Sequence, residues 1–169
     1  MTSIQTPRLI IKKPKISDKK ILIKHLSNWE VIKWLKRIPF PYLLEDADWW
    51  INIHTKEKNN LEYNIYLNDE LIGGIGFKIS EDSKDYIIGY WLAHETWGRG
   101  YMTESCKHFL DHMIKNLQIK KIKASYFEDN KASAILLRKF NFKIVGNSKH
   151  FSFTRNKKIS YIDLELIIH

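Results

Sequence analysis

Two spacings of apolar residues alternate along the chain, one typical of strands and one typical of helices. Short apolar runs between polar turns predict strands at 9–13, 61–67, 71–79, 86–92, 119–127, 151–154 and 159–168. Apolar residues at helical spacing predict helices at 18–26, 29–35, 45–56, 101–117 and 131–140. The pattern predicts a mixed α/β (α+β) chain in which three successive strands form an antiparallel meander before the longest helix.

The central stretch joins the strand at 86–92 to that helix through a turn containing Gly98 and Gly100. Glycines let the main chain approach a ligand without a Cβ in the way, and a helix N-terminus offers unpaired N–H groups and a partial positive charge. The turn therefore predicts an anion site, with Arg99 and Thr103 beside it. Neither a Rossmann fingerprint nor a P-loop fits, because Thr103 replaces the third glycine and no Gly-Lys-Ser/Thr end is present.

Three glycines, Gly73, Gly74 and Gly76, interrupt the strand at 71–79. Glycine weakens a regular strand and often marks a bulge or a close approach of another backbone. We expect one of these two features here rather than an undisturbed ladder.

Bulk properties favour one globular domain that spans residues 1–169. The hydrophobic content of 44% excludes global disorder, and the N-terminus lacks the apolar region of a signal peptide, so a soluble cytoplasmic protein is expected. The single cysteine, Cys106, falls on the apolar side of a helix and is predicted to be buried. The formal charge of +9 suits an anionic ligand or an acidic assembly, although the lysines do not gather on one helix face.

The segment WGRGYMTE, after IGYWL, resembles the acetyl-coenzyme A site of the GNAT N-acetyltransferases, most closely the RimJ/RimL-like subgroup. The general pattern there is Q/R-x-x-G-x-G/A; Glu95 stands at its first position, so only the glycine pair matches strictly. The opening T-x-R-L and the loop PFPYLLEDADWW are also similar to this subgroup. So is YFEDNKASAILLRKFNF, in which Asn141 replaces a usual glycine but can adopt the same left-handed conformation.

This resemblance implies a single GNAT domain with a mostly antiparallel sheet of about seven strands, helices on both faces and splayed central strands. It also implies acetyl-CoA as cosubstrate, with the pantetheine arm along residues 91–93 and the pyrophosphate on residues 97–103. The implied cofactor-binding residues are Trp91, Leu92, Ala93, Trp97, Gly98, Arg99, Gly100, Tyr101, Met102, Thr103, Asn130 and Ser133.

Acetyl transfer needs a proton donor for the departing thiolate and a route for the proton of the amine. Many relatives use a tyrosine as the acid, but Leu137 stands at that position, and Ser133 fits the serine that replaces it in the RimJ/RimL-like branch. Ser133 can also serve only as a helix cap. Related chains carry a glutamate where this chain has Ile87, which leaves Asp85, Tyr90, Glu45 and Asp46 as candidates for the base, or no dedicated base at all.

The pair His108 and His112 lacks the His-Glu-x-x-His order, so we expect a solvated helix face and no metal. The resemblance implies transfer of an acetyl group to a protein N-terminal α-amine, such as that of a ribosomal protein, or to a small-molecule amine. The expected protein is a monomer or homodimer with no membrane partner. The alternatives are a catalytically impaired coenzyme A-binding module and a basic domain associated with nucleic acid or the ribosome.

Overall fold

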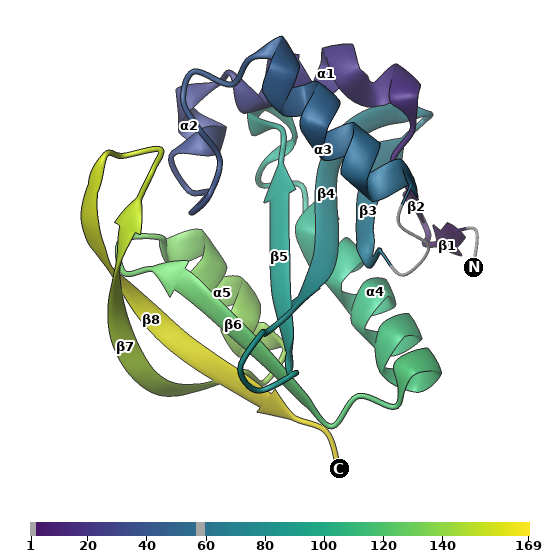
Figure 1. Cartoon of the computed structure of the whole chain (residues 1–169). Coiled ribbons are helices and arrows are strands. Elements are labelled where there is room, and N and C mark those ends of the chain that lie inside the picture. The colour runs from purple at the N-terminus through teal and green to yellow at the C-terminus, as the bar shows by residue number, and fades with distance from the viewer. Residues whose placement is uncertain (1–2, 57–59) are drawn as a thin grey trace.

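The computed structural model describes residues 3–56 and 60–169, in which eight strands form one sheet of order β1-β2-β3-β4-β5-β6-β8-β7 (Figure 1). The strands are β1 (Ser3–Gln5), β2 (Ile10–Lys12), β3 (Glu62–Leu67), β4 (Glu70–Ile79), β5 (Tyr86–Leu92), β6 (Lys121–Phe127), β7 (Lys143–Ser152) and β8 (Lys157–Ile167). The helices are α1 (Lys19–Leu26), α2 (Trp29–Ile32), α3 (Leu44–Lys56), α4 (Tyr101–Leu117) and α5 (Lys131–Lys139), with the 3₁₀ turns η1 (Ile16–Asp18) and η2 (His94–Thr96).

Neighbouring strands run antiparallel except β5 and β6, which are parallel and joined through α4. These two strands pair only at Tyr86 with Ile122 and at Ile87 with Lys123, and then diverge. The mixed, mostly antiparallel sheet and the splayed central strands predicted from the resemblance are therefore present. Figure 1 shows the widening gap between the upper parts of β5 and β6.

Helices cover both faces of the sheet, and each face has its own core. One core packs α4 and α5 against the strands, and its centre is Phe109, whose ring lies 5.0 Å from that of Phe77. Cys106 belongs to this core, where burial raises the pKa of its thiol. The other core packs α1, α2 and α3 on the opposite face, around Tyr66 and Leu71.

The strand predictions hold for the buried strands and fail where burial is low. The short edge strand β1 was not predicted, and it brings the count to eight instead of about seven. The strand predicted at 151–154 is correct only for Phe151 and Ser152, because β7 already begins at Lys143 and the chain turns at 153–156. β7 is an edge strand with almost every side chain exposed, so it lacks the alternation of apolar and polar residues that reveals a strand.

The two local backbone predictions at glycine and asparagine positions are confirmed. The pairing of β3 with β4 shifts register between Ile65 and Tyr66, so a bulge lies beside the glycines of β4. Asn141 has a φ of 63° and closes the end of α5 in the left-handed conformation.

Candidate active site

A fork in the sheet leaves backbone groups of β5 unpaired. The Ala93 N–H donates to Ile72 C=O at 2.8 Å, on the β4 side. Because backbone groups alternate sides along a strand, those of Leu92 and Tyr90 point away from β4 and into the gap beside β6. The Leu92 C=O is occupied by the Trp97 indole, whose Nε1–H donates to it at 3.0 Å. The N–H and C=O of Tyr90 and the N–H of Leu92 therefore remain available to an extended ligand.

The glycine turn between η2 and α4 presents a second set of free backbone donors. Gly98 and Gly100 have φ values of 73° and 77°, in the left-handed region that other residues adopt only with strain. The N–H groups of residues 98–103 have no acceptor within the described residues. They surround the N-terminus of the 17-residue helix α4, so the helix dipole reinforces their attraction for an anion.

Two residues of the N-terminal segment, Thr6 and Arg8, hold the glycine turn in place. Glu104, in the first turn of α4, accepts from Thr6 Oγ1 at 2.6 Å, from the Arg8 N–H at 2.8 Å and from Arg8 Nε at 2.7 Å. Arg8 Nη1 also donates to Arg99 C=O at 3.1 Å, and its guanidinium lies 4.6 Å from the centre of the Tyr101 ring. The Thr-x-Arg opening of the chain thus fixes the backbone of the glycine turn.

Glu104→Ala is expected to lower the free energy of unfolding by about 1–3 kcal/mol, because it removes a charged acceptor from three donors. The backbone amides of residues 98–103 should also exchange faster once Arg8 is released. Denaturant unfolding and hydrogen exchange measure the two effects. The matched control is Asp111→Ala on the same helix, which breaks only an exposed pair with Lys107 and should cost about 0–1 kcal/mol. Equal losses in the two variants would contradict the bracing role of Glu104.

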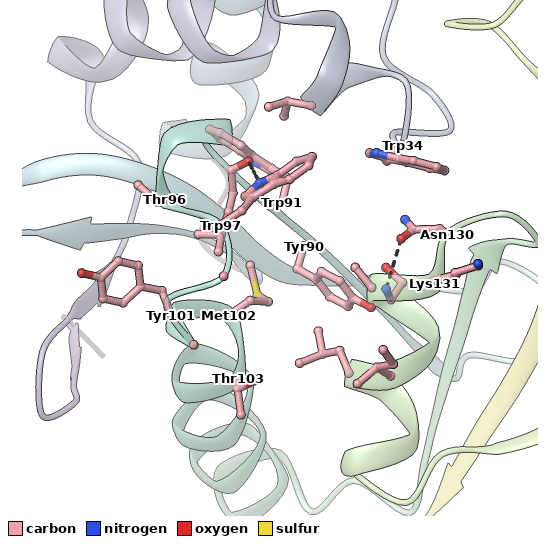
Figure 2. Close-up of a pocket in the computed structure, with 18 of the residues that line it drawn as sticks. Trp34, Tyr90, Trp91, Thr96, Trp97, Tyr101, Met102, Thr103, Asn130 and Lys131 are labelled. Carbon is pink, nitrogen blue, oxygen red and sulfur yellow. Dashed lines mark hydrogen bonds between the residues drawn. The ribbon is translucent and has the colours of Figure 1, made fainter.

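The fork and the glycine turn open into one cavity of about 710 Å³. Figure 2 shows Trp91 and Trp97 on one side of it and Trp34 and Asn130 on the other. The cavity is lined by Val31, Trp34, Leu35, Tyr90, Trp91, Leu92, Thr96, Trp97, Gly98, Gly100, Tyr101, Met102, Thr103, Asp129, Asn130, Lys131, Ala132, Ser133, Ile135, Leu136 and Lys139. The cavity has backbone N–H donors at one end, a long apolar wall along its length and a second end near α2.

The first turn of α5 places the Ser133 side chain against Tyr90. Asn130 Oδ1 accepts from the Ser133 N–H at 3.1 Å and caps the helix. The Ser133 hydroxyl is therefore not needed for the cap and instead lies beside the Tyr90 side chain. Burial raises the pKa of Tyr90, and the neighbouring Ser133 hydroxyl opposes that shift. Two neutral hydroxyl groups thus meet at the cavity wall.

Most residues predicted for cofactor binding line this cavity, but Ala93 and Arg99 do not, and neither does Asp85, which was predicted as a candidate base. Asp85 precedes β5 at the closed end of the fork, 3.1 Å from Lys121 Nζ and 3.0 Å from Lys123 Nζ. Hydrogen bonding to Ser83, followed by the two lysines, lowers the pKa of Asp85 to about 2 against the effect of burial. A carboxylate held so strongly in its charged form is a poor proton acceptor, and the structure does not bring it to the cavity.

Other predicted candidates lie outside the cavity as well. Glu45 is exposed and Asp46 is half-buried in the first turn of α3, where Asp46 Oδ2 accepts from the Leu43 N–H at 2.8 Å. The described residues contain no cluster of three or more side chains suited to a metal ion, and His108 and His112 lie partly exposed along α4. In residues 3–56 and 60–169, every helix is too short or too polar to cross a bilayer.

Sequence reasoning missed the part of the lining that comes from α2 and the turn after it. Trp34 has the Arg155 guanidinium 4.7 Å from its ring centre and packs edge-on against Phe127. Val31 and Leu35 continue the same wall. These residues read as ordinary helix positions in the sequence, and only the approach of α2 to the fork makes them part of a site.

Comparison with known proteins adds independent findings. Residues 8–143 match the model of the acetyltransferase (GNAT) domain. Among curated proteins, the chain is 26% identical to the uncharacterized N-acetyltransferase p20 of Bacillus licheniformis, over 99% of this chain and 97% of p20. Among solved structures it is similar to RimL, a ribosomal L7/L12 α-N-protein acetyltransferase, with a TM-score of 0.83, 22% identity and coverage of 98% and 94%. The structure of a RimL complex with coenzyme A is similar to this chain with a TM-score of 0.82, 21% identity and coverage of 98% of each chain.

Proposed function

This chain belongs to the GNAT acetyltransferase family and is an acyltransferase, and we propose that it transfers an acetyl group from acetyl-CoA to a primary amine by direct attack. The observation that carries the proposal is the continuity of the site. A forked strand with free backbone groups, a glycine turn with free N–H groups and an apolar wall all open into one cavity.

Each part of the cavity suits one part of acetyl-CoA. The N–H groups of residues 98–103 suit the diphosphate, because backbone donors at a helix N-terminus favour anions. The free groups of Tyr90 and Leu92 suit the two amides of the pantetheine arm, which can pair with β5 as an added strand. In this arrangement the thioester lies near the closed end of the fork, beside Tyr90 and the first turn of α5.

The reaction forms a bond between the amine nitrogen and the acetyl carbon and breaks the bond between that carbon and sulfur. An N–H donor of the fork stabilises the oxygen that becomes negatively charged. The departing thiolate takes a proton through the Ser133 and Tyr90 hydroxyl pair, which touches the cavity where sulfur would leave. Burial suits this role because it keeps the Tyr90 hydroxyl protonated at neutral pH.

Purified protein mixed with acetyl-CoA and a panel of amines tests the proposal, with release of free thiol followed over time. We expect thiol release that depends on the amine, and mass spectrometry of the native protein should show a bound coenzyme A species. Binding of acetyl-CoA without transfer to any amine would instead favour the coenzyme A-binding module. Absence of acetyl-CoA binding would contradict the assignment of the cavity as the acetyl-CoA site.

Ser133→Ala is expected to lower turnover about 10–100-fold, within the range for loss of a proton-transfer group, while the affinity for acetyl-CoA changes less than about twofold. The cap of α5 should persist, because it uses the Ser133 N–H and not the hydroxyl. Ser148→Ala is a control that removes a hydroxyl of β7 outside the cavity, where it bonds Asp163, and it should keep the wild-type turnover. Steady-state kinetics and calorimetry separate the two quantities, and unchanged turnover would leave Ser133 with no chemical role.

For the acceptor, we propose a protein N-terminal α-amine, as in the RimJ/RimL-like subgroup. RimL is named for its action on ribosomal L7/L12, and its fold matches this chain over nearly its whole length. The second end of the cavity, at Val31, Trp34 and Leu35, is apolar and open toward α2, which suits the first side chains of a peptide. Peptides with a free N-terminus should therefore be better acceptors than polyamines of the same concentration.

A further inference from the structure

Glu62, at the start of β3, directs its carboxylate across a neighbouring strand. Glu62 pairs with Gly76 of β4, and a Cβ added at Gly76 would collide with Glu62 Oε2. The Glu62 N–H donates to Asn60 Oδ1 at 2.8 Å, which fixes the backbone at this point. Gly76 is therefore the residue that lets the carboxylate lie flat against the sheet and extend toward β5.

A second glycine continues this opening to the fork. Gly76 pairs in turn with Gly89 of β5, and a Cβ at Gly89 would meet no atom within 4 Å. Gly89 has no positive φ, so the missing side chain and not the backbone conformation is the distinctive property of this position. Gly89 also lies two residues beyond Ile87, the last residue of β5 that pairs with β6. The two glycines thus leave a clear path from the closed end of the fork to the Glu62 carboxylate.

The path lies on the same sheet face as part of the cavity wall. Gly74 is two residues from Gly76, so both would carry side chains on one face, and a Cβ at Gly74 would meet the Trp91 indole. Trp91 lines the cavity. Glu62 and Trp91 therefore lie on the same face of the sheet. They are two residues, or about 7 Å, apart along the strand direction and two strands apart across the sheet.

The surroundings of Glu62 leave its carboxylate without a fixed partner. Within residues 3–56 and 60–169, no hydrogen bond or ion pair to the Glu62 side chain is formed. The positive charge of Lys13 acts on the Glu62 carboxylate, but Lys13 Nζ donates its hydrogen bond to Asn60 C=O and lies over the Tyr63 ring. From α3, His54 contributes its C=O, which accepts from Asn60 Nδ2. Burial raises the pKa of Glu62 to about 7, and Lys13 opposes the shift.

This environment is the reverse of that of Asp85, which two lysines hold in its charged form. A proton acceptor works best when its affinity for the proton matches the working pH. Resting on the proposed acetyl transfer, we infer that Glu62 is the general base, which accepts the proton of the incoming ammonium across Gly76 and Gly89, directly or through one water molecule. Glu62 lies on the same face of the sheet as Gly89 and Ile87 of β5, two strands away.

The protons balance in this scheme. The ammonium group gives one proton to Glu62, and the resulting amine attacks the thioester. The carbon–sulfur bond then breaks. The nitrogen loses a second proton and the thiolate takes up one proton, so these two transfers cancel. Glu62 then returns its proton to solvent. The products are the acetylated amine and the free thiol of coenzyme A.

Glu62→Gln tests the inference with acetyl-CoA and two nucleophiles, a short peptide with a free N-terminus and hydroxylamine. The peptide amine must lose a proton, whereas hydroxylamine is already unprotonated at neutral pH. We expect peptide acetylation to fall about 100-fold, hydroxylamine acetylation to stay within about twofold, and the rise of kcat/KM with pH near 7 to disappear. The matched control is Glu70→Gln at the other end of the β3–β4 pair, which should keep wild-type rates with both nucleophiles.

Gly89→Val provides a second variant in which Glu62 is intact but the path is blocked. It should fold, because the space beside Gly89 is open, and it should lose peptide acetylation while keeping its affinity for acetyl-CoA. Wild-type peptide rates in Glu62→Gln, or equal losses with the peptide and with hydroxylamine, would overturn the inference. A wild-type protein that binds acetyl-CoA but acetylates neither nucleophile would overturn the proposed function itself.

Discussion

Replacing Gly100 with aspartate is expected to lower the affinity for acetyl-CoA at least 100-fold. The added carboxylate would stand at the N-terminus of α4, beside the N–H groups proposed to hold the diphosphate. Two like charges about 5 Å apart repel by roughly 3 kcal/mol at an effective dielectric constant of ~20, which corresponds to about a 100-fold change in the dissociation constant. The left-handed φ of 77° adds strain for any residue with a Cβ.

Calorimetric titration with acetyl-CoA measures this effect, and two controls separate its causes. Gly100→Ala introduces the same strain without the charge, and the nearest atom to its Cβ, Arg8 Nη2, lies at an ordinary contact distance of 3.6 Å. It should lose stability but much less affinity. Gly146→Asp adds the same charge in β7, outside the cavity lining, and should bind as the wild type does. Tight binding by Gly100→Asp would refute the diphosphate site.

Phe109→Ala is expected to lower the free energy of unfolding by about 3–5 kcal/mol, the range for removal of a fully buried ring. Phe109 is completely buried in α4, with ring centres 5.8 Å from Tyr63 of β3 and 5.0 Å from Phe77 of β4. The ring therefore ties the helix that carries the anion site to the strands beneath it. Loss of the ring should also loosen the glycine turn, so that acetyl-CoA affinity falls together with stability.

Denaturant unfolding followed by circular dichroism measures the loss. Phe153→Ala removes the same ring from an exposed position, where 66% of the residue remains accessible, and should change stability by less than about 0.5 kcal/mol. A similar cost at both positions would show that α4 is not held by this core.

Local sequence signals were sufficient for the elements and for one end of the site. The strand at 86–92, the left-handed glycines and the long amphipathic helix follow each other directly in the chain, so spacing alone predicted the donors at residues 98–103. Asn130, which the resemblance placed in the cofactor site, lines the cavity and also caps α5. The edge strands β1 and β7 were misjudged, because exposed strands carry little of the alternation on which the prediction depends.

Residues that are distant in sequence were beyond the reach of that reasoning. Asp85 was a candidate base near the start of β5, but two lysines of β6 pair with its carboxylate. Glu62 gave no signal, because its approach to the fork depends on the register of three strands and on two glycines in different strands. Trp34 joined the site only through the position of α2.

The sequence by itself determined the order of strands and helices, the anion-binding turn and the family resemblance, because each depends on residues that are close together in the chain. Tertiary structure alone decided which carboxylate faces the fork, which residues close the far end of the cavity and which end of the chain braces the turn. The reason is physical: burial and charge at a side chain are set by neighbours brought from other parts of the chain, and these set proton affinity and access.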